Sequence, residues 1–125
     1  LPRVKLYADW RSGITAEAAE QLVYSPGFLP ALQVAVHGKS LPSPEQPART
    51  EDLERPTLNQ HTADHATVTL PATGFATVML INNTIDSSWQ ASIEGNPIAI
   101  HRANLNAVAV HLPASETKRI IKFTR

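Results

Sequence analysis

The sequence predicts a mainly β domain: an antiparallel β-sandwich, jelly-roll-like, with one short N-terminal α-helix. Short segments in which apolar and polar residues alternate are separated by turn residues, which is typical of a sandwich. Hydrophobic residues make up 42% of the chain, enough to form a core. A length of 125 residues fits one folding unit, so residues 1–125 are treated as a single domain.

The N-terminal part is predicted to contain two strands and the helix. Residues 3–8 alternate weakly and predict the first strand. Thr15 is the expected N-cap of a short helix, which should end at the Ser-Pro-Gly sequence of residues 25–27. Residues 32–36 predict a second strand. Residues 38–56 contain four prolines among charged residues and predict an extended connection within the domain.

The remaining chain is predicted to be a series of short strands. The segment 75–82 is apolar on both faces, which favours a strand at the centre of a sheet. The alternating segments differ in sequence, and we identify no internal repeat among them. The predicted strands are 57–61, 66–70, 75–82, 89–94, 98–102, 107–112 and 119–124.

The clearest local pattern is a predicted β-hairpin around Trp89. Apolar and polar residues alternate strictly over 89–94, and the Gly-Asn-Pro sequence of residues 95–97 predicts the turn before the strand at 98–102. The alternation places Trp89 on the buried face, where its ring fills the core. The alternative interpretation is that the ring stacks on the apolar face of a sugar.

Composition excludes several classes of function. Lys plus Arg and Asp plus Glu number 11 each, and a formal charge of zero argues against a nucleic-acid partner. The absence of cysteine excludes disulfides and thiolate sites. No apolar stretch approaches the ~20 residues of a membrane-spanning helix. Because the chain begins with Leu1 rather than Met, we expect it to be a piece of a longer protein.

Several short motifs occur along most of the chain in an order that matches a known family. They are Leu1-Pro2-Arg3, Ser25-Pro26-Gly27-Phe28-Leu29-Pro30, Ser88-Trp89-Gln90-Ala91-Ser92-Ile93-Glu94-Gly95, Arg102-Ala103-Asn104 and Leu112-Pro113-Ala114-Ser115. In this order they resemble the C-terminal part of the YfhO family of bacterial multi-pass membrane proteins. The chain departs from that pattern at Ser88, Glu94 and Ser115, where turns and acidity are kept, and at Arg125, where the family often has an aromatic residue.

The resemblance implies a place and a role. YfhO-type proteins are similar to lipid-linked-sugar glycosyltransferases and end in an extracytoplasmic domain. We therefore expect a non-catalytic domain at the extracytoplasmic face of the bacterial membrane, assisting substrate or partner binding. Its expected partners are the membrane-embedded part of its own chain and a glycan or lipid-linked sugar, with Trp89, Glu94, Arg102 and Asn104 as candidate ligand-binding residues. The alternative is a carbohydrate-binding module.

The sequence predicts no catalytic residues, no cofactor and no metal site. His61, Asp64 and His65 are residue types that bind zinc, but on a β-rich segment their spacing favours a solvated loop. Asp86 and Glu94 could serve glycoside chemistry only if they converged in a cleft, and we interpret them as surface turn residues.

Two further motifs are given structural interpretations. Residues 70–74, Leu-Pro-Ala-Thr-Gly, spell a sortase recognition sequence, but they lead directly into an apolar strand and predict a turn. Residues 82–84 form an Asn-Asn-Thr glycosylation pattern, which matters only in a secretory host.

Overall fold

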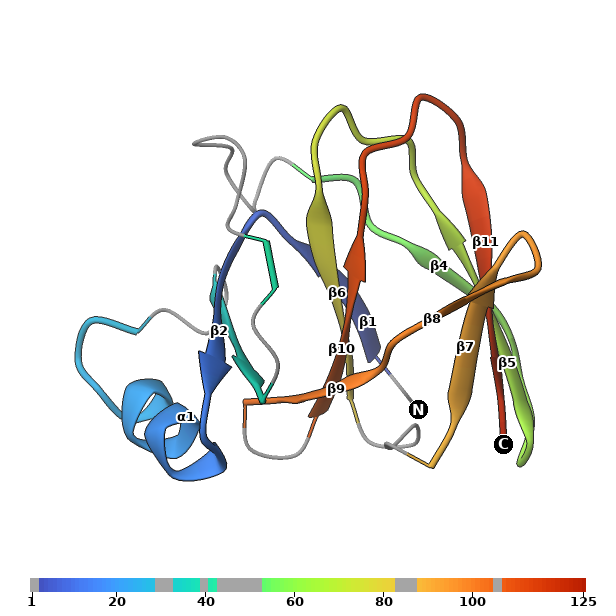
Figure 1. Ribbon diagram of the computed structural model, residues 1–125. Coiled ribbons are helices and arrows are strands. Elements are labelled where there is room, and N and C mark those ends of the chain that lie inside the picture. Colours follow the sequence, from blue (N-terminus) through green and yellow to red (C-terminus); the bar gives the residue numbers. More distant parts are fainter. Residues whose placement is uncertain (1–2, 29–32, 39–40, 43–52, 83–87, 105–106) are drawn as a thin grey trace.

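The computed structural model describes residues 3–28, 33–38, 41–42, 53–82, 88–104 and 107–125. Two β-sheets face each other and one helix lies at the side (Figure 1), which confirms the mainly β sandwich and its short helix. One sheet has six strands in the order β1 (Arg3–Tyr7), β6 (Thr77–Asn82), β10 (Ala107–Leu112), β9 (His101–Ala103), β3 (Gln33–His37) and β2 (Asp9–Ile14). The other has five, in the order β4 (Thr57–His61), β5 (His65–Leu70), β11 (Arg119–Thr124), β7 (Gln90–Ile93) and β8 (Asn96–Ile98).

The main core lies between the two sheets. It is formed by the inward-facing residues of β5, β7 and β11 on one side and of β1, β6 and β10 on the other. Met79, Ile81, Ile121 and Phe123 are among its fully buried side chains. The alternation of buried and exposed residues along β11 is the period-two pattern on which the sequence prediction depended.

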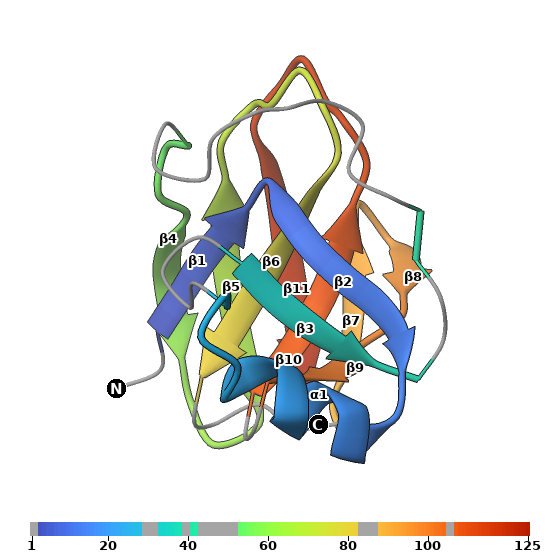
Figure 2. The same cartoon turned by 90° about the vertical axis from the view of Figure 1, so that its left-hand side faces the viewer.

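A second core covers the outer face of the six-stranded sheet. Val78 and Leu80 point away from the main core, and they pack with Trp10, Val34 and Val36 of β2 and β3. Figure 2 shows how this is possible, because β2 and β3 cross in front of β6 and β10. β6 is therefore buried on both faces, which confirms the prediction that residues 75–82 contain a central strand.

The strand β2 was not expected from the sequence. Its burial does alternate, with Arg11 and Gly13 exposed and Trp10 the one buried side chain, but the sequence Asp-Trp-Arg-Ser-Gly-Ile has too few apolar residues to show this alternation. β2 also pairs with β3 in parallel, whereas the other strand pairs described are antiparallel. The expectation of a wholly antiparallel sandwich is therefore wrong at this edge.

The helix α1 (Ala16–Val23) explains the parallel pair, because it carries the chain back to the start of β3. Thr15 caps it as predicted, its hydroxyl accepting a hydrogen bond from the Ala18 amide at 3.1 Å. The helix packs on β3 through a small cluster in which Ala19 and Ala35 are fully buried. With eight residues, α1 is the one helix in the described ranges, and it is too short to cross a bilayer.

The predicted strand at residues 98–102 is instead split between the two sheets. β8 ends at Ile98 and pairs with β7, whereas β9 pairs with β10 in the opposite sheet. The chain between them passes across the edge of the sandwich (Figure 1). A run of alternating residues does not reveal this change, because Ile98 and Ile100 both pack against the main core.

The hairpin turn also lies one residue earlier than predicted. Ile93 pairs with Asn96, so the turn consists of Glu94 and Gly95, with φ of 51° and 81°. Positive φ at both positions is typical of a two-residue type I′ turn, whose twist matches the flanking strands. Pro97 lies within β8 at the edge of the sheet, where a residue without an N–H is tolerated.

Two connections of the fold are equivalent in their pairing. Residues 71–76 connect β5 to β6, and residues 113–118 connect β10 to β11; we call these two connections the paired arches. Each follows a leucine and begins with Pro-Ala and then a hydroxyl residue. Thr73 and Ser115 exchange backbone hydrogen bonds of 3.0 and 2.9 Å, which joins the two arches at equivalent positions.

The strands flanking the paired arches are equivalent as well. Arg119 pairs with Leu70, and in the same relation Thr77 pairs with Leu112. In sequence the two segments share only Leu-Pro-Ala and the hydroxyl residue that follows, and their later positions differ in polarity. The turn interpretation of residues 70–74 is confirmed, since they end β5 and enter the first arch.

The proline-rich connection is described only at residues 38, 41–42 and 53–56. Pro42 O accepts a hydrogen bond from the Trp10 indole at 2.9 Å, and the Leu41 amide donates to Ser12 Oγ at 2.9 Å. This part of the connection is thereby attached to β2.

Candidate functional site

A cavity of about 430 Å³ opens at the edge of the five-stranded sheet, where β8 leaves β7 and the chain crosses to β9. We call it the edge groove. It is lined by residues of the β7–β8 hairpin, the crossing segment and the end of β11. These are Trp89, Gln90, Ala91, Ser92, Gly95, Pro97, Ile98, Ile100 and Thr124.

Trp89 is both a core residue and a wall of the edge groove. Its side chain is 3% exposed and belongs to the main core, which confirms the prediction that the ring is buried. However, its indole Nε1 has no hydrogen-bond partner among the described residues, although a buried indole N–H normally has one. The indole of Trp10, by contrast, donates to Pro42 O. Trp89 is therefore a buried donor with unused hydrogen-bonding capacity beside a cavity.

The other polar residues of the edge groove are neutral. Gln90, Ser92 and Thr124 supply amide and hydroxyl groups, which both donate and accept hydrogen bonds. Thr124 lies opposite Gln90 in the pairing of β11 with β7, so these two side chains are on the same face of the sheet. The guanidinium of Arg125 lies 5.8 Å from the centre of the Trp89 ring, within the range of a cation–π interaction.

The backbone adds a further feature to this site. β7 and β8 pair only from Ala91 onward, so on the β8 side the chain at Trp89 and Gln90 extends beyond its neighbouring strand. Such a sheet edge presents backbone groups that a ligand can reach. A small molecule in the groove would thus meet part of the Trp89 side chain, neutral polar residues and a strand edge.

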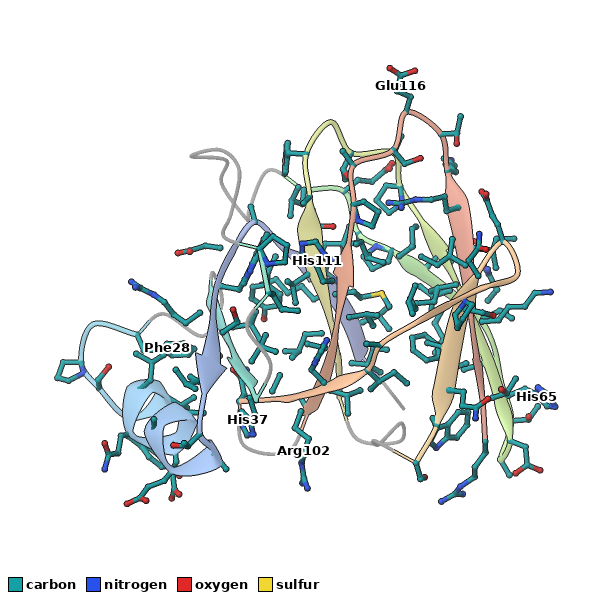
Figure 3. All side chains as sticks on the ribbon, viewed as in Figure 1. Phe28, His37, His65, Arg102, His111 and Glu116 are labelled. Carbon is teal, nitrogen blue, oxygen red and sulfur yellow. The ribbon has the colours of Figure 1, made fainter. Side chains whose placement is uncertain are left out.

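Of the four ligand-binding residues predicted from the sequence, only Trp89 lines the edge groove. Glu94 is exposed in the hairpin turn at the other end of β7, next to Gly95, which does line it. Arg102 is exposed on β9, in the other sheet, and its side chain points away from the sandwich (Figure 3). The structure therefore does not bring these four residues together.

Asn104 joins two neighbouring strands of the six-stranded sheet, β9 and β3. Its Oδ1 accepts a hydrogen bond from the Ala35 amide at 2.9 Å, and its own amide donates to Ala35 O at 2.7 Å. Its carbonyl oxygen lies 2.7 Å from Nε2 of His37. With φ of 50°, the residue adopts the left-handed conformation that asparagine tolerates better than most residues. These contacts join the end of β9 to β3.

Sequence reasoning missed Gln90, Ser92, Thr124 and Arg125 as neighbours of Trp89. The sequence analysis assigned the polar residues of β7 to its exposed face. It interpreted Arg125 only as a departure from the family pattern, which often has an aromatic residue there. Residues near 90 and near 124 become neighbours through the pairing of β7 with β11. The one feature of the sequence that could have indicated this neighbourhood was Arg125, an arginine directly after the apolar strand at 119–124.

The two carboxylates considered for glycoside chemistry cannot be compared, because Asp86 lies outside the described residues. Within the described ranges, no three His, Asp or Glu residues form a group that could hold a metal ion. His65 is exposed at the start of β5 (Figure 3), and the side chain of His61 lies outside the described part of the structure.

We expect zinc neither to bind tightly nor to raise the melting temperature. A structural zinc site normally needs four ligands, and the described residues of the His61–His65 segment do not converge on one. Thermal melts with zinc and with a chelator check this, because a ligand at a hundredfold excess over its Kd would add about 2.7 kcal/mol of stability. A rise of several degrees that disappears in His65→Ala would contradict the expectation.

Comparisons of the chain with protein families, with curated proteins and with solved structures find no match.

Proposed function

We propose that this chain is a non-catalytic extracytoplasmic domain of a bacterial integral membrane protein of the YfhO type, and that it assists substrate or partner binding. The order of the sequence motifs supports the proposal. Those motifs also occupy defined places in the fold: Trp89 precedes β7, Glu94 and Gly95 form the hairpin turn, and Asn104 follows β9. The proposed partner is the membrane-embedded part of the same protein.

The edge groove is the proposed binding site, with a sugar unit of a glycan or lipid-linked sugar as its ligand. The observation that carries this is a cavity lined by Trp89 together with the polar residues Gln90, Ser92 and Thr124. A sugar presents hydroxyl groups that accept from an N–H and bond to amides and hydroxyls, and its apolar face suits the groove residues Ile98 and Ile100. We assign no catalytic residue to the domain.

The alternative is a carbohydrate-binding module that acts by itself. It is favoured by the fact that the edge groove is formed by this one chain. The two functions predict different sequences upstream of this domain. The membrane protein requires apolar spans of about 20 residues each, and an autonomous module does not. Reading the complete gene therefore decides between them.

The indole N–H groups provide a direct test of sugar binding. With ¹⁵N-labelled protein, the N–H signals of Trp10 and Trp89 are assigned with Trp10→Phe and followed during titration with trisaccharides of glucose and of N-acetylglucosamine. We expect a saturable shift of the Trp89 signal with at least one sugar and no shift of the Trp10 signal, because the Trp10 N–H is already bonded to Pro42 O.

Gln90→Ala should weaken that binding about tenfold through the loss of one hydrogen-bonding side chain, while the melting temperature stays the same because Gln90 is exposed. Glu116→Gln, at the exposed tip of the second arch, is the control and should bind as the parent does (Figure 3). If both sugars leave the Trp89 signal unmoved at millimolar concentration, the edge groove is not a sugar site.

A further inference from the structure

A polar surface continues from the edge groove across the outer face of the five-stranded sheet. Along β5, β7 and β11, buried residues of the main core alternate with residues that are exposed or half-buried on the other side of the sheet. Cross-strand pairing arranges six of these outward residues in two rows, which we call the outer rows. One row consists of Gln90, Thr124 and His65, and the other of Ser92, Lys122 and Thr67.

The outer rows and the edge groove share a wall. Gln90, Ser92 and Thr124 line the groove and also belong to the outer rows. Directly opposite side chains on one face of antiparallel strands lie about 5 Å apart, so each row is a continuous path from β7 over β11 to β5. A ligand that extends from the groove over β7 therefore meets Lys122 and then Thr67 along the second row.

The chemistry of the outer rows suits a sugar chain. The amide of Gln90 and the hydroxyls of Ser92, Thr67 and Thr124 both donate and accept hydrogen bonds, as sugar hydroxyls do. Lys122 adds donors, and neither row contains a carboxylate. The core of a protein–protein interface is usually apolar and aromatic, whereas the two rows contain no large apolar side chain. These rows therefore favour a glycan over a protein surface as the occupant.

We infer that the edge groove holds one unit of an oligosaccharide whose neighbouring units lie along the outer rows. This inference rests on the proposed function and adds that the ligand is a chain of several sugar units. β7 and β5 are separated by two strand spacings, roughly 10 Å, and a single sugar ring in the groove does not span that distance.

Oligomers of glucose and of N-acetylglucosamine with one, three and five units test the inference by NMR. The indole N–H of Trp89 reports on the groove, and the methyl group of Thr67 reports on the far end of an outer row. We expect the pentasaccharide to bind at least about tenfold more tightly than the monosaccharide, because it makes additional hydrogen bonds. Only the longer oligomers should shift the Thr67 signal.

The same titrations separate this inference from the proposed function. If all lengths bind with the same Kd and the Thr67 signal stays unmoved, the ligand is a single unit and the outer rows are not part of the site, while the sugar site of the edge groove stands. If no oligomer shifts the Trp89 signal, both proposals are wrong.

Two threonine variants complete the test. Thr67→Ala removes one hydroxyl from the outer rows, so it should weaken pentasaccharide binding about threefold to tenfold and leave monosaccharide binding unchanged. Thr117→Ala, at an exposed position of the second arch, is the matched control and should change neither. If Thr67→Ala weakens the binding of both sugars by the same factor, Thr67 acts on the groove through the fold and the inference is wrong.

Discussion

Replacing Trp89 by alanine is expected to lower the free energy of unfolding by about 3–5 kcal/mol, the usual cost of removing a large buried aromatic ring. The ring is 3% exposed and packs in the main core, so its loss leaves a cavity between the sheets. Chemical denaturation followed by circular dichroism measures the change. Trp89→Phe, which keeps much of the volume, should cost clearly less.

The same pair of variants tests how Trp89 divides its roles. Trp89→Phe removes the unpartnered Nε1 donor but keeps an aromatic ring. We therefore expect a marked loss of sugar affinity in the edge groove and only a small loss in the free energy of unfolding. If Trp89→Ala unfolds at the same denaturant concentration as the parent and only sugar binding is lost, the ring is a binding platform and the core interpretation is wrong.

Asn104→Ala is expected to destabilise the domain by about 2–4 kcal/mol, from the loss of a hydrogen-bond acceptor and from backbone strain. The Oδ1 of Asn104 accepts from the Ala35 amide, and the residue has φ of 50°, which alanine adopts at a cost. The effect should concentrate on β3 and β9, the strands that Asn104 joins. Thermal unfolding and amide hydrogen exchange of Ala35 measure both.

Two control substitutions divide this effect into its parts. Asn104→Gly accommodates the positive φ but lacks the acceptor, so it should recover only the strain, about 1 kcal/mol. Asn104→Asp retains an oxygen at the acceptor position and should keep the Ala35 amide protected. Equal stability of the alanine variant and the parent would contradict the role given to this residue.

The edge groove exists because of one topological event, the passage of the chain from β8 to β9. β8 is only three residues long and contains Pro97, so the hairpin cannot extend along the whole of β7. The start of β7 is thereby left beside a cavity at a sheet edge. Natural proteins usually protect such edges, which is a further reason to regard this one as a binding surface.

Much of the fold could be predicted because its signals are local. The hydroxyl of Thr15 before a helix-forming segment identifies the N-terminus of α1, and the alternation along 119–124 identifies the buried face of β11. The burial of Trp89 follows from the same alternation, and the apolar faces of 75–82 predict a central strand. In each case the residues that carry the information lie within a few positions of one another.

The tertiary structure decided what depends on partners far apart in the chain. Alternation specifies which face of a strand is buried but not which strand lies beside it, so the parallel pairing of β2 and the division of 98–102 between two sheets could not be predicted. For the same reason, the pairing of β7 with β11, which brings Thr124 to the edge groove, could not be predicted. The sequence alone determined most of the strands, the helix and the buried ring. The candidate site was determined by the order in which the strands pair, because that order arises from the packing of two cores and not from any local pattern of residues.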